Sequence, residues 1–412
     1  MAENELPNHE QRDIGVNRGN YNEDVESYFE NNAQNIFNAK ELHIHHYGTN
    51  NSSETNLSQT FEPKNDLVDS NLKDLSLETV DGQVPLNSSF YIERPQIETN
   101  CYEAVLEPGA LIRIKAPCKM GKTSLMSRIL AHGIQQGYKS AMINSWSSEL
   151  LTDIKKFLQG FCANVSEDLQ LSINLEDYWK PYLSNQKNCS KYFSDHILKE
   201  VASPIVLGLD DVDQIFSYPA IAEEFFKLLR SWHDKGKNDE LWQKLRIVIS
   251  HSQEVYIDLN VNHSPFGNVG SSFELGEFNQ LQIKELIKRH RLNWSTQEIE
   301  QLINMVDGHP YLLRMALYQL AKDQLTLDKF LELAPTAQGL FADHLYGYLL
   351  VLENNPSLKQ AMQKVIHSEV PVKLDFKVAF KLQSLGLVKT IGNKVSILCN
   401  VYRLYFLDRL ND

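Results

Sequence analysis

Residues 110–123 join an apolar run to a loop of the kind that binds phosphate, and a helix-forming run follows from Ser124. The loop, residues 116–123, has the spacing of the P-loop pattern with alanine in place of the first glycine. Gly121 would let backbone N–H groups close around phosphate oxygens, and the start of a helix adds partial positive charge. A chance match is the alternative, but strand before and helix after are both present. The stretch therefore predicts a nucleotide site at the end of a strand.

The side chains of this loop have separate expected roles. Lys122 would reach the β- and γ-phosphates, and the Thr123 hydroxyl would complete the shell of a magnesium ion. ATP and Mg²⁺ are thus the expected cofactors. The candidate nucleotide-binding residues of the loop are Ala116, Pro117, Cys118, Lys119, Met120, Gly121, Lys122, Thr123 and Ser124.

Charge and cysteine content exclude several classes of protein. A formal net charge of −13 argues against a broad nucleic-acid-binding surface, although one domain could still carry a basic patch. The five cysteines include no C-x-x-C pair, which predicts free thiols in a reducing compartment and no zinc site. The first twenty residues are polar, and no apolar run approaches membrane-spanning length. The sequence thus predicts a cytoplasmic protein without a membrane partner.

Residues 1–85 differ in composition from the rest of the chain. They are rich in Asn, Glu and Ser and poor in large aliphatic residues, which predicts a mostly disordered arm. Residues 36–47 are an exception, because Leu42, Ile44 and His46 form one face of a strand-like alternation. Such a segment could add a strand to a partner protein or stack with copies of itself. A tail without a partner is the alternative.

From residue 86 the pattern is that of an α/β protein. Apolar runs of strand length alternate with helical patterns and predict a parallel sheet covered on both faces. Residues 149–201 read as a helical insertion at the sheet edge. The predicted strands are 110–115, 139–144, 204–209 and 245–250. The expected parts are an ATPase core at 86–278, a helical lid at 279–350 and a winged-helix-like domain at 351–412.

Two further strand ends carry polar side chains that suit the chemistry of a nucleotide site. Asp210 and Asp211 follow the strand 204–209, where Asp210 would hold Mg²⁺ and Asp211 would polarise the attacking water. A capping turn is the structural alternative. Ser250, at the end of strand 245–250, is either a sensor of the γ-phosphate or a plain strand terminus.

Taken in order, these motifs resemble the bacterial AAA-like ATPase family, related to the STAND and origin-recognition branches of the AAA+ ATPases. The resemblance covers roughly residues 86–412. It implies a P-loop core, a helical lid and a C-terminal winged helix. The matching stretches are residues 90–98, 116–123, 209–213, 264–278, 308–311 and 402–410.

The resemblance also implies site residues outside the loop. The segment containing Arg94 would pack near the adenine, and Pro310 in a Gly-x-Pro motif would lie against the base. Arg314, one turn later, would read the γ-phosphate. The family usually has Glu where this chain has Asp211, which is one methylene shorter. Hydrolysis is therefore expected to be slow, or the chain binds nucleotide and scarcely turns it over.

The favoured expectation is an ATP-dependent molecular switch in bacterial signalling or defence, compatible with a homo-oligomer. A protein partner would bind the arm or the winged helix. The alternative is a DNA-associated ATPase whose winged helix contacts DNA, although the acidity of the chain does not favour nucleic acid. A small-molecule kinase is the least favoured class. The lysines available to DNA are Lys373, Lys377, Lys381, Lys389 and Lys394.

Overall fold

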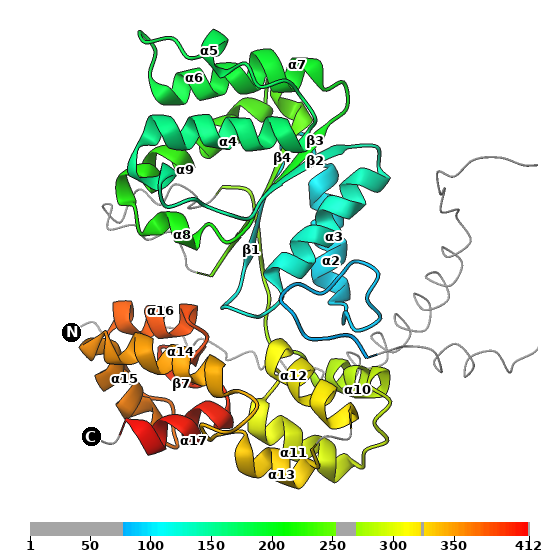
Figure 1. Cartoon of the computed structure of the whole chain (residues 1–412), viewed down its shortest axis with the longest axis vertical. Coiled ribbons are helices and arrows are strands. Elements are labelled where there is room, and N and C mark those ends of the chain that lie inside the picture. The colour runs from blue at the N-terminus through cyan, green and yellow to red at the C-terminus, as the bar shows by residue number, and fades with distance from the viewer. Residues whose placement is uncertain (1–76, 253–268, 323–324, 411–412) are drawn as a thin grey trace, which may run out of the picture. The chain divides into compact units, whose positions relative to one another are not determined.

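The computed structural model describes residues 77–252, 269–322 and 325–410 (Figure 1). The strand-like segment 36–47 and the stretch 264–268 lie outside the described residues. Among the described helices, none combines the length and apolar character needed to cross a bilayer.

In the described part of the chain, five parallel strands form one sheet in the order β2-β3-β4-β1-β5. Strand β4 separates β1, which leads into the phosphate-binding loop, from β3, which leads into Asp210 and Asp211. The loop and the acidic pair share one edge of the sheet, because the carboxyl ends of parallel strands meet there. The predicted parallel α/β sheet is confirmed. The strands are β1 (Leu111–Lys115), β2 (Lys139–Ile143), β3 (Ile205–Leu209), β4 (Leu245–His251) and β5 (Ser271–Glu274).

Helices cover both faces of this sheet (Figure 1). Because successive side chains of a strand point to opposite faces, Leu207 of β3 packs with Phe157 and Phe225, whereas Val206 packs with Leu125. Burial on both faces explains why β3 and most of β4 read as continuous apolar runs. The first face carries α4 (Ile154–Asp168) and α9 (Pro219–Gly236), and the second carries α2 (Pro95–Leu106) and α3 (Lys122–Gln135).

The segment 149–201 is largely helical, and its longest helix, α4, contacts the edge strand β2. This agrees with the predicted insertion at the sheet edge. The shorter helical elements of the sheet-containing part are η2 (Leu150–Thr152), α5 (Leu175–Tyr178), α6 (Asn185–Tyr192), the π-helix η3 (Phe193–Ile197), α7 (Leu198–Glu200), α8 (Asp213–Phe216) and η4 (Trp242–Lys244).

Consecutive helices follow β5. Two of them begin with capping boxes, in which Asn279 pairs with Gln282 and Ser295 pairs with Glu298. An antiparallel β-hairpin then precedes the last helix. The elements are α10 (Gln280–Arg289), α11 (Thr296–Val306), α12 (Pro310–Ala321), α13 (Leu327–Leu333), α14 (Ala342–Glu353), α15 (Pro356–Ile366), α16 (Phe376–Ser384), β6 (Val388–Ile391), β7 (Lys394–Ile397) and α17 (Asn400–Arg409).

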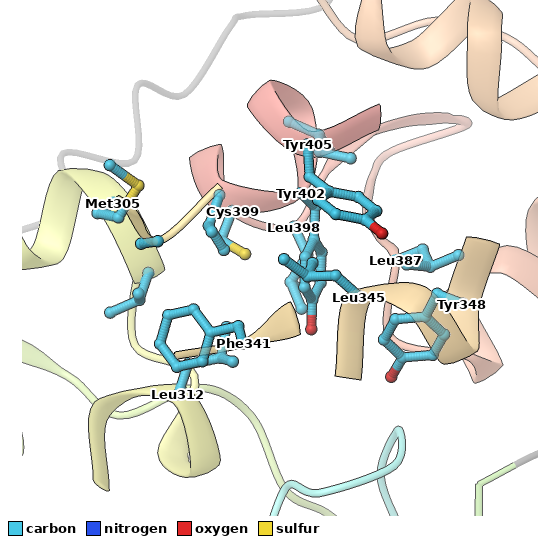
Figure 2. Packing of buried hydrophobic residues seen from close by; sticks show 14 of the residues in the cluster. Met305, Leu312, Phe341, Leu345, Tyr348, Leu387, Leu398, Cys399, Tyr402 and Tyr405 are labelled. Carbon is cyan, nitrogen blue, oxygen red and sulfur yellow. The ribbon is translucent and has the colours of Figure 1, made fainter. Parts of the chain in front are cut away.

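One buried apolar cluster runs from the lid helices into the C-terminal helices. Figure 2 shows Leu312 of α12 beside Phe341, the residue before α14, with Leu345 and Tyr348 of α14 and Tyr402 of α17 in the same cluster. The predicted boundary between residues 350 and 351 falls inside α14. The shared cluster means that α14 belongs to both parts, which is a packing relation that the local pattern does not reveal.

Residues 77–85 are ordered, although the sequence assigned them to the disordered arm. The backbone N–H of Val84 donates to the Ser124 hydroxyl at 2.9 Å, and Arg128 donates to the carbonyl of Pro85 at 2.8 Å. These bonds attach the segment to α3. The last residues of the predicted arm are therefore hydrogen-bonded to α3, whose side chains supply partners that composition cannot show.

Candidate functional site

The predicted phosphate-binding loop connects β1 to α3. Gly121 is the N-cap of α3 and has a φ of +97°, a left-handed conformation that glycine adopts without steric penalty. The ammonium of Lys122 donates to the carbonyls of Ala116 and Pro117, each at 3.0 Å. The Lys122 side chain thus folds back along the loop. The first backbone N–H groups of α3 lie at the end of the same loop, as anion binding requires.

Asp210 connects this loop to the neighbouring strands. Its Oδ2 accepts a hydrogen bond from Thr123 Oγ1 at 2.7 Å, and its Oδ1 accepts one from the Ser250 hydroxyl. Asp210 and Ser250 are both buried. The structure therefore brings three predicted residues, from three separate elements, into one hydrogen-bonded group at the carboxyl edge of the sheet.

Asp211 has a different environment. Its side chain is exposed, and its φ of +51° is a left-handed value that Asp tolerates better than most residues. Its backbone N–H donates to Ser250 Oγ at 3.0 Å, and its carboxylate accepts from Gln214 Nε2 at 2.9 Å. Ser250 thus contacts both acidic residues. The buried carboxylate of Asp210 faces the loop threonine, and that of Asp211 is paired with a glutamine.

Arg94 links the segment before α2 to the loop. Its buried guanidinium donates to the carbonyls of Met120 at 3.1 Å and Gly276 at 3.4 Å. Its Cζ lies 4.7 Å from the centre of the Phe278 ring. Burial lowers the pKa of Arg94 from its usual value. Arg94 therefore joins the phosphate-binding loop to the stretch between β5 and α10.

The remaining loop residues differ in exposure. Cys118 and Lys119 are exposed, whereas Ser124, which lies within α3, is buried. The Ser124 hydroxyl accepts the bond from Val84 described above. Ser124 is thus engaged with the segment that precedes α2.

Pro310 begins α12, and His309 is the N-cap of that helix. The Nδ1 atom of His309 accepts from the backbone N–H of Leu312 at 3.5 Å, and the ring is buried. Burial lowers the pKa of His309 to about 4. The Gly-x-Pro motif is therefore the start of a helix capped by a neutral histidine.

Arg314 of α12 contacts the segment before α2. One guanidinium nitrogen donates to His290 Nε2 at 2.7 Å, and another lies 3.8 Å from the carboxylate of Glu78. Its Cζ lies 4.1 Å from the centre of the Phe90 ring. Burial lowers the pKa of Arg314 to about 10. None of these three partners belongs to the loop, so these contacts do not bring Arg314 to the residues around Lys122.

Two residues of the site were missed by sequence reasoning. Trp146 follows β2, and its Nε1 donates to the backbone carbonyl of Asp210 at 2.8 Å. Gln214 holds the Asp211 carboxylate. Trp146 could have been found, because it follows a strand at the edge where the site lies. Gln214 carries no such signal, since its position depends on the left-handed turn at Asp211.

The donor set of this site fits Mg²⁺ better than a soft metal. Thr123 and Asp210 offer oxygen ligands, which Mg²⁺ prefers. No three His, Cys, Asp or Glu side chains gather into a metal-holding group among the described residues. A magnesium ion here would therefore take its remaining ligands from phosphate oxygens and water, which is how this ion is bound in ATPase sites.

The fold and the arrangement of the loop define an α/β protein of the P-loop class with an AAA+-like ATPase fold. The chain belongs to the AAA-like domain family, whose model matches residues 79–408. No curated protein matches the sequence.

Solved structures are similar to this chain at low sequence identity. The Walker-type ATPase PABY2304 of Pyrococcus abyssi is similar with a TM-score of 0.53 and 14% identity, over 77% of this chain and 96% of that chain. The ORC2 protein of Aeropyrum pernix in ADPNP–ADP complexes is similar with a TM-score of 0.47 and 13% identity, over 81% of this chain and 96% of that chain. Domain III of the Thermotoga maritima replication initiation protein DnaA is similar with a TM-score of 0.37 and 17% identity, over 60% of this chain and 95% of that chain.

Proposed function

We propose that this protein is an ATP-binding molecular switch that hydrolyses ATP slowly. The observation that carries the proposal is the 2.7 Å hydrogen bond between Thr123 and Asp210. This bond joins the end of the phosphate-binding loop to the end of β3, although β4 lies between their strands. A P-loop ATPase needs a hydroxyl and a carboxylate at that point for its metal ion.

Different residues of the site would bind the phosphates and the metal ion. Lys122 and the backbone N–H groups at the start of α3 would bind the phosphates, and Thr123 with Asp210 would hold Mg²⁺. When bound, Mg²⁺ neutralises charge that develops on the phosphate oxygens. Ser250 orients Asp210 through its hydrogen bond, and it fixes the backbone of Asp211.

Slow turnover follows from the environment of Asp211. As the base that polarises water, its carboxylate must face the terminal phosphate, but Gln214 already donates to it. The side chain is also short. We therefore expect the chain to remain in its nucleotide-bound states for long periods, as a switch does, rather than to turn over rapidly.

The family and the contacts of Arg94 support a switch that acts through the lid. Arg94 bonds both the loop and the stretch that leads into α10, so a change in the loop reaches the lid helices. ATP would hold one arrangement, and hydrolysis or exchange would release it. We assign the protein to the STAND-type signalling ATPases of the bacterial cytoplasm by analogy. Residues 36–47 or the winged-helix-like domain would bind a protein partner or a second copy.

The test is ATP binding by the full chain and by Lys122→Ala, measured by calorimetry with and without Mg²⁺. Removal of a charge-assisted hydrogen bond to phosphate, which contributes about 1.5–3 kcal/mol, should weaken ATP binding roughly 10- to 100-fold. Lys155→Ala, on the exposed surface of α4, is the matched control and should bind as the wild type does. Equal affinity of Lys122→Ala and wild type would reject the nucleotide site.

A DNA-associated ATPase is the second candidate, favoured by the exposed lysines Lys373, Lys377, Lys381 and Lys394. Other residues argue against it. Lys389 donates to Asp307 at 2.6 Å, and α16 contributes Phe380 and Gln383 to a small cavity that Ala116 and Pro117 also line. Gel shifts at low and moderate salt, with and without ATP, decide between the two. Sequence-independent binding that disappears at moderate salt would leave the switch as the better assignment, whereas salt-resistant, ATP-dependent binding would favour the DNA function.

A further inference from the structure

Lys119, the exposed lysine of the phosphate-binding loop, contacts two helices that follow the sheet-containing part of the chain. Its ammonium lies 4.0 Å from the centre of the Tyr311 ring, at the start of α12. The same ammonium lies 3.2 Å from Nδ1 of His344 in α14. Because Lys119 lies between Ala116 and Lys122 in sequence, any change in the shape of the loop moves this side chain.

His344 connects Lys119 to the C-terminal helix α17, and the donor and acceptor of each hydrogen bond can be assigned. A lysine ammonium can only donate, so Nδ1 of His344 accepts and its Nε2 carries the proton. That Nε2 donates to the Tyr402 hydroxyl of α17 at 2.8 Å, and the Tyr402 hydroxyl is in turn hydrogen-bonded to Tyr348. Burial, together with Lys119, lowers the pKa of His344 to about 3, so the ring is neutral as this order requires. The four side chains form one chain of hydrogen bonds.

A second contact meets the same loop from the turn between α16 and β6. Gly386 has a φ of +77°, and a Cβ added there would lie 3.1 Å from Cβ of Pro117. A side chain there would crowd Pro117 and would also hold a strained left-handed backbone. The loop is therefore touched at Pro117 and at Lys119 by different elements of the C-terminal helices and hairpin.

We propose that Lys119 is the residue through which the phosphate-binding loop holds α12, α14 and α17, and that release of this contact is a step in nucleotide exchange. The inference rests on the proposed nucleotide switch and names the side chains that transmit its state. Lys119 acts here as a positioning residue, through Tyr311 and His344, rather than by contact with the phosphates.

The expected effect is moderate, because Lys119 is exposed and an exposed cation–π contact is weak. Loss of the contact should increase the rate of nucleotide release about three- to tenfold. It should also increase amide hydrogen exchange in α14 and α17, since these helices lose a hydrogen-bonded neighbour.

The experiment is a double-mutant cycle on the full chain. The variants Lys119→Met, Tyr311→Leu and their combination are compared for the dissociation rate of a fluorescent ADP and for hydrogen exchange without nucleotide. Each single variant should release ADP about three- to tenfold faster, and the double variant should release it no faster than the singles. The conservative variants Lys119→Arg and Tyr311→Phe keep the cation and the ring, and they should restore release to within about twofold of wild type.

A matched control lies on the same helix. The Lys322 ammonium lies 4.4 Å from the centre of the Tyr318 ring, so Lys322→Met removes a similar contact that does not involve the loop. It should change neither the release rate nor exchange in α17. If Tyr311→Leu does not fold, His344→Phe takes its place in the cycle.

Additive effects in the double variant would overturn the proposal, because Lys119 would then act on the nucleotide independently of Tyr311. Wild-type release and exchange in every variant would overturn it as well. Should the wild type bind no fluorescent ADP, the proposed function fails. Hydrogen exchange in α14 and α17 of the nucleotide-free variants then shows, without any nucleotide measurement, whether the Lys119 contact holds these helices.

Discussion

Asp210 and Asp211 are neighbours in sequence, but their carboxylates have different partners. Substitution of each residue should therefore have a different effect on ATP binding and hydrolysis. Asp210 bonds Thr123 and is buried, so Asp210→Asn should weaken the binding of ATP in the presence of Mg²⁺. Asp211 is exposed and is the proposed base that polarises water, so Asp211→Asn should abolish turnover and leave ATP affinity within about threefold of wild type. Calorimetry and single-turnover hydrolysis measure the two effects. Identical behaviour of the two variants would contradict this division of roles.

The length of the Asp211 side chain gives a second prediction at the residue scale. If reach limits the reaction, Asp211→Glu should raise the rate of hydrolysis. Gln214→Ala frees the Asp211 carboxylate from its 2.9 Å partner and should alter the rate without changing ATP affinity. Single-turnover rates of the two variants and of wild type provide the measurement. A lower rate in Asp211→Glu would mean that the turn has adapted to aspartate.

The success of sequence reasoning at this scale depended on motif spacing and strand ends. Thr123 and Asp210 could be predicted because a loop pattern and the end of a buried run each define a position in a parallel sheet. Arg314 was assigned through family resemblance, and its observed partners are His290 at the end of α10 and Glu78 in the segment before α2. That segment could not be placed from sequence, because its contacts come from side chains far away along the chain.

At the scale of elements, the buried strands β3 and β4 were predictable from their apolar residues, and the short exposed β5 was not. Strands β1 to β4 end close to their predicted limits. Strand β5 has four residues, mostly exposed, and is held by pairing with β1, where Ser271 lies opposite Ile112. No hydrophobic period marks such an edge strand. Strand β5 forms because its backbone pairs with that of β1, and its own side chains do not indicate a strand.

Two buried histidines make the lid helices sensitive to acid. His290 donates from Nδ1 to Leu286 and accepts at Nε2 from Arg314, and burial lowers its pKa to about 4. His309, also with a pKa of about 4, must stay neutral to cap α12. Both values lie below the usual 6.5 of an unfolded chain, so the unfolded state binds more protons. Stability is then full above pH 6.5 and decreases as the pH falls toward 4.

This predicts a loss of roughly 2 kcal/mol per histidine between pH 7.5 and pH 5. Denaturant unfolding at the two pH values measures it. The variant His309→Asn keeps an N-cap acceptor that does not titrate, so its stability should decrease by about 2 kcal/mol less over the same range. An equal decrease in the variant and in wild type would contradict the role given to His309.

At the scale of the whole molecule, the lid and the sheet-containing part are joined by the segment that precedes α2. Gln282 of α10 donates to the carbonyl of Glu93 at 2.7 Å, and Arg289 of the same helix donates to the carbonyl of Ser89 at 3.0 Å. Ile92 packs into the apolar cluster of the lid. A segment with few large apolar residues is thus fixed mainly by side chains of α3 and α10, which hydrogen-bond to its backbone.

Two truncations that differ by nine residues test where the ordered protein begins. Removal of residues 1–76 should leave melting temperature and ATP affinity unchanged, because the composition of this part predicts a mostly disordered arm whose strand-like segment 36–47 would bind a partner rather than the ATPase. Removal of residues 1–85 also removes Val84 and Pro85, which bond Ser124 and Arg128 of α3. These bonds contribute about 1 kcal/mol each, so the melting temperature should fall by a few degrees.

The longer truncation should also weaken ATP binding, since Ser124 and Arg128 lie in the helix whose N-terminus would bind phosphate. The point variant Val84→Pro in the full chain is the matched comparison, because it removes a single backbone donor. It should reproduce part of the stability loss without any change in chain length. If both truncations melt and bind alike, residues 77–85 contribute nothing to the ATPase, and the protein effectively begins at the segment that α10 holds.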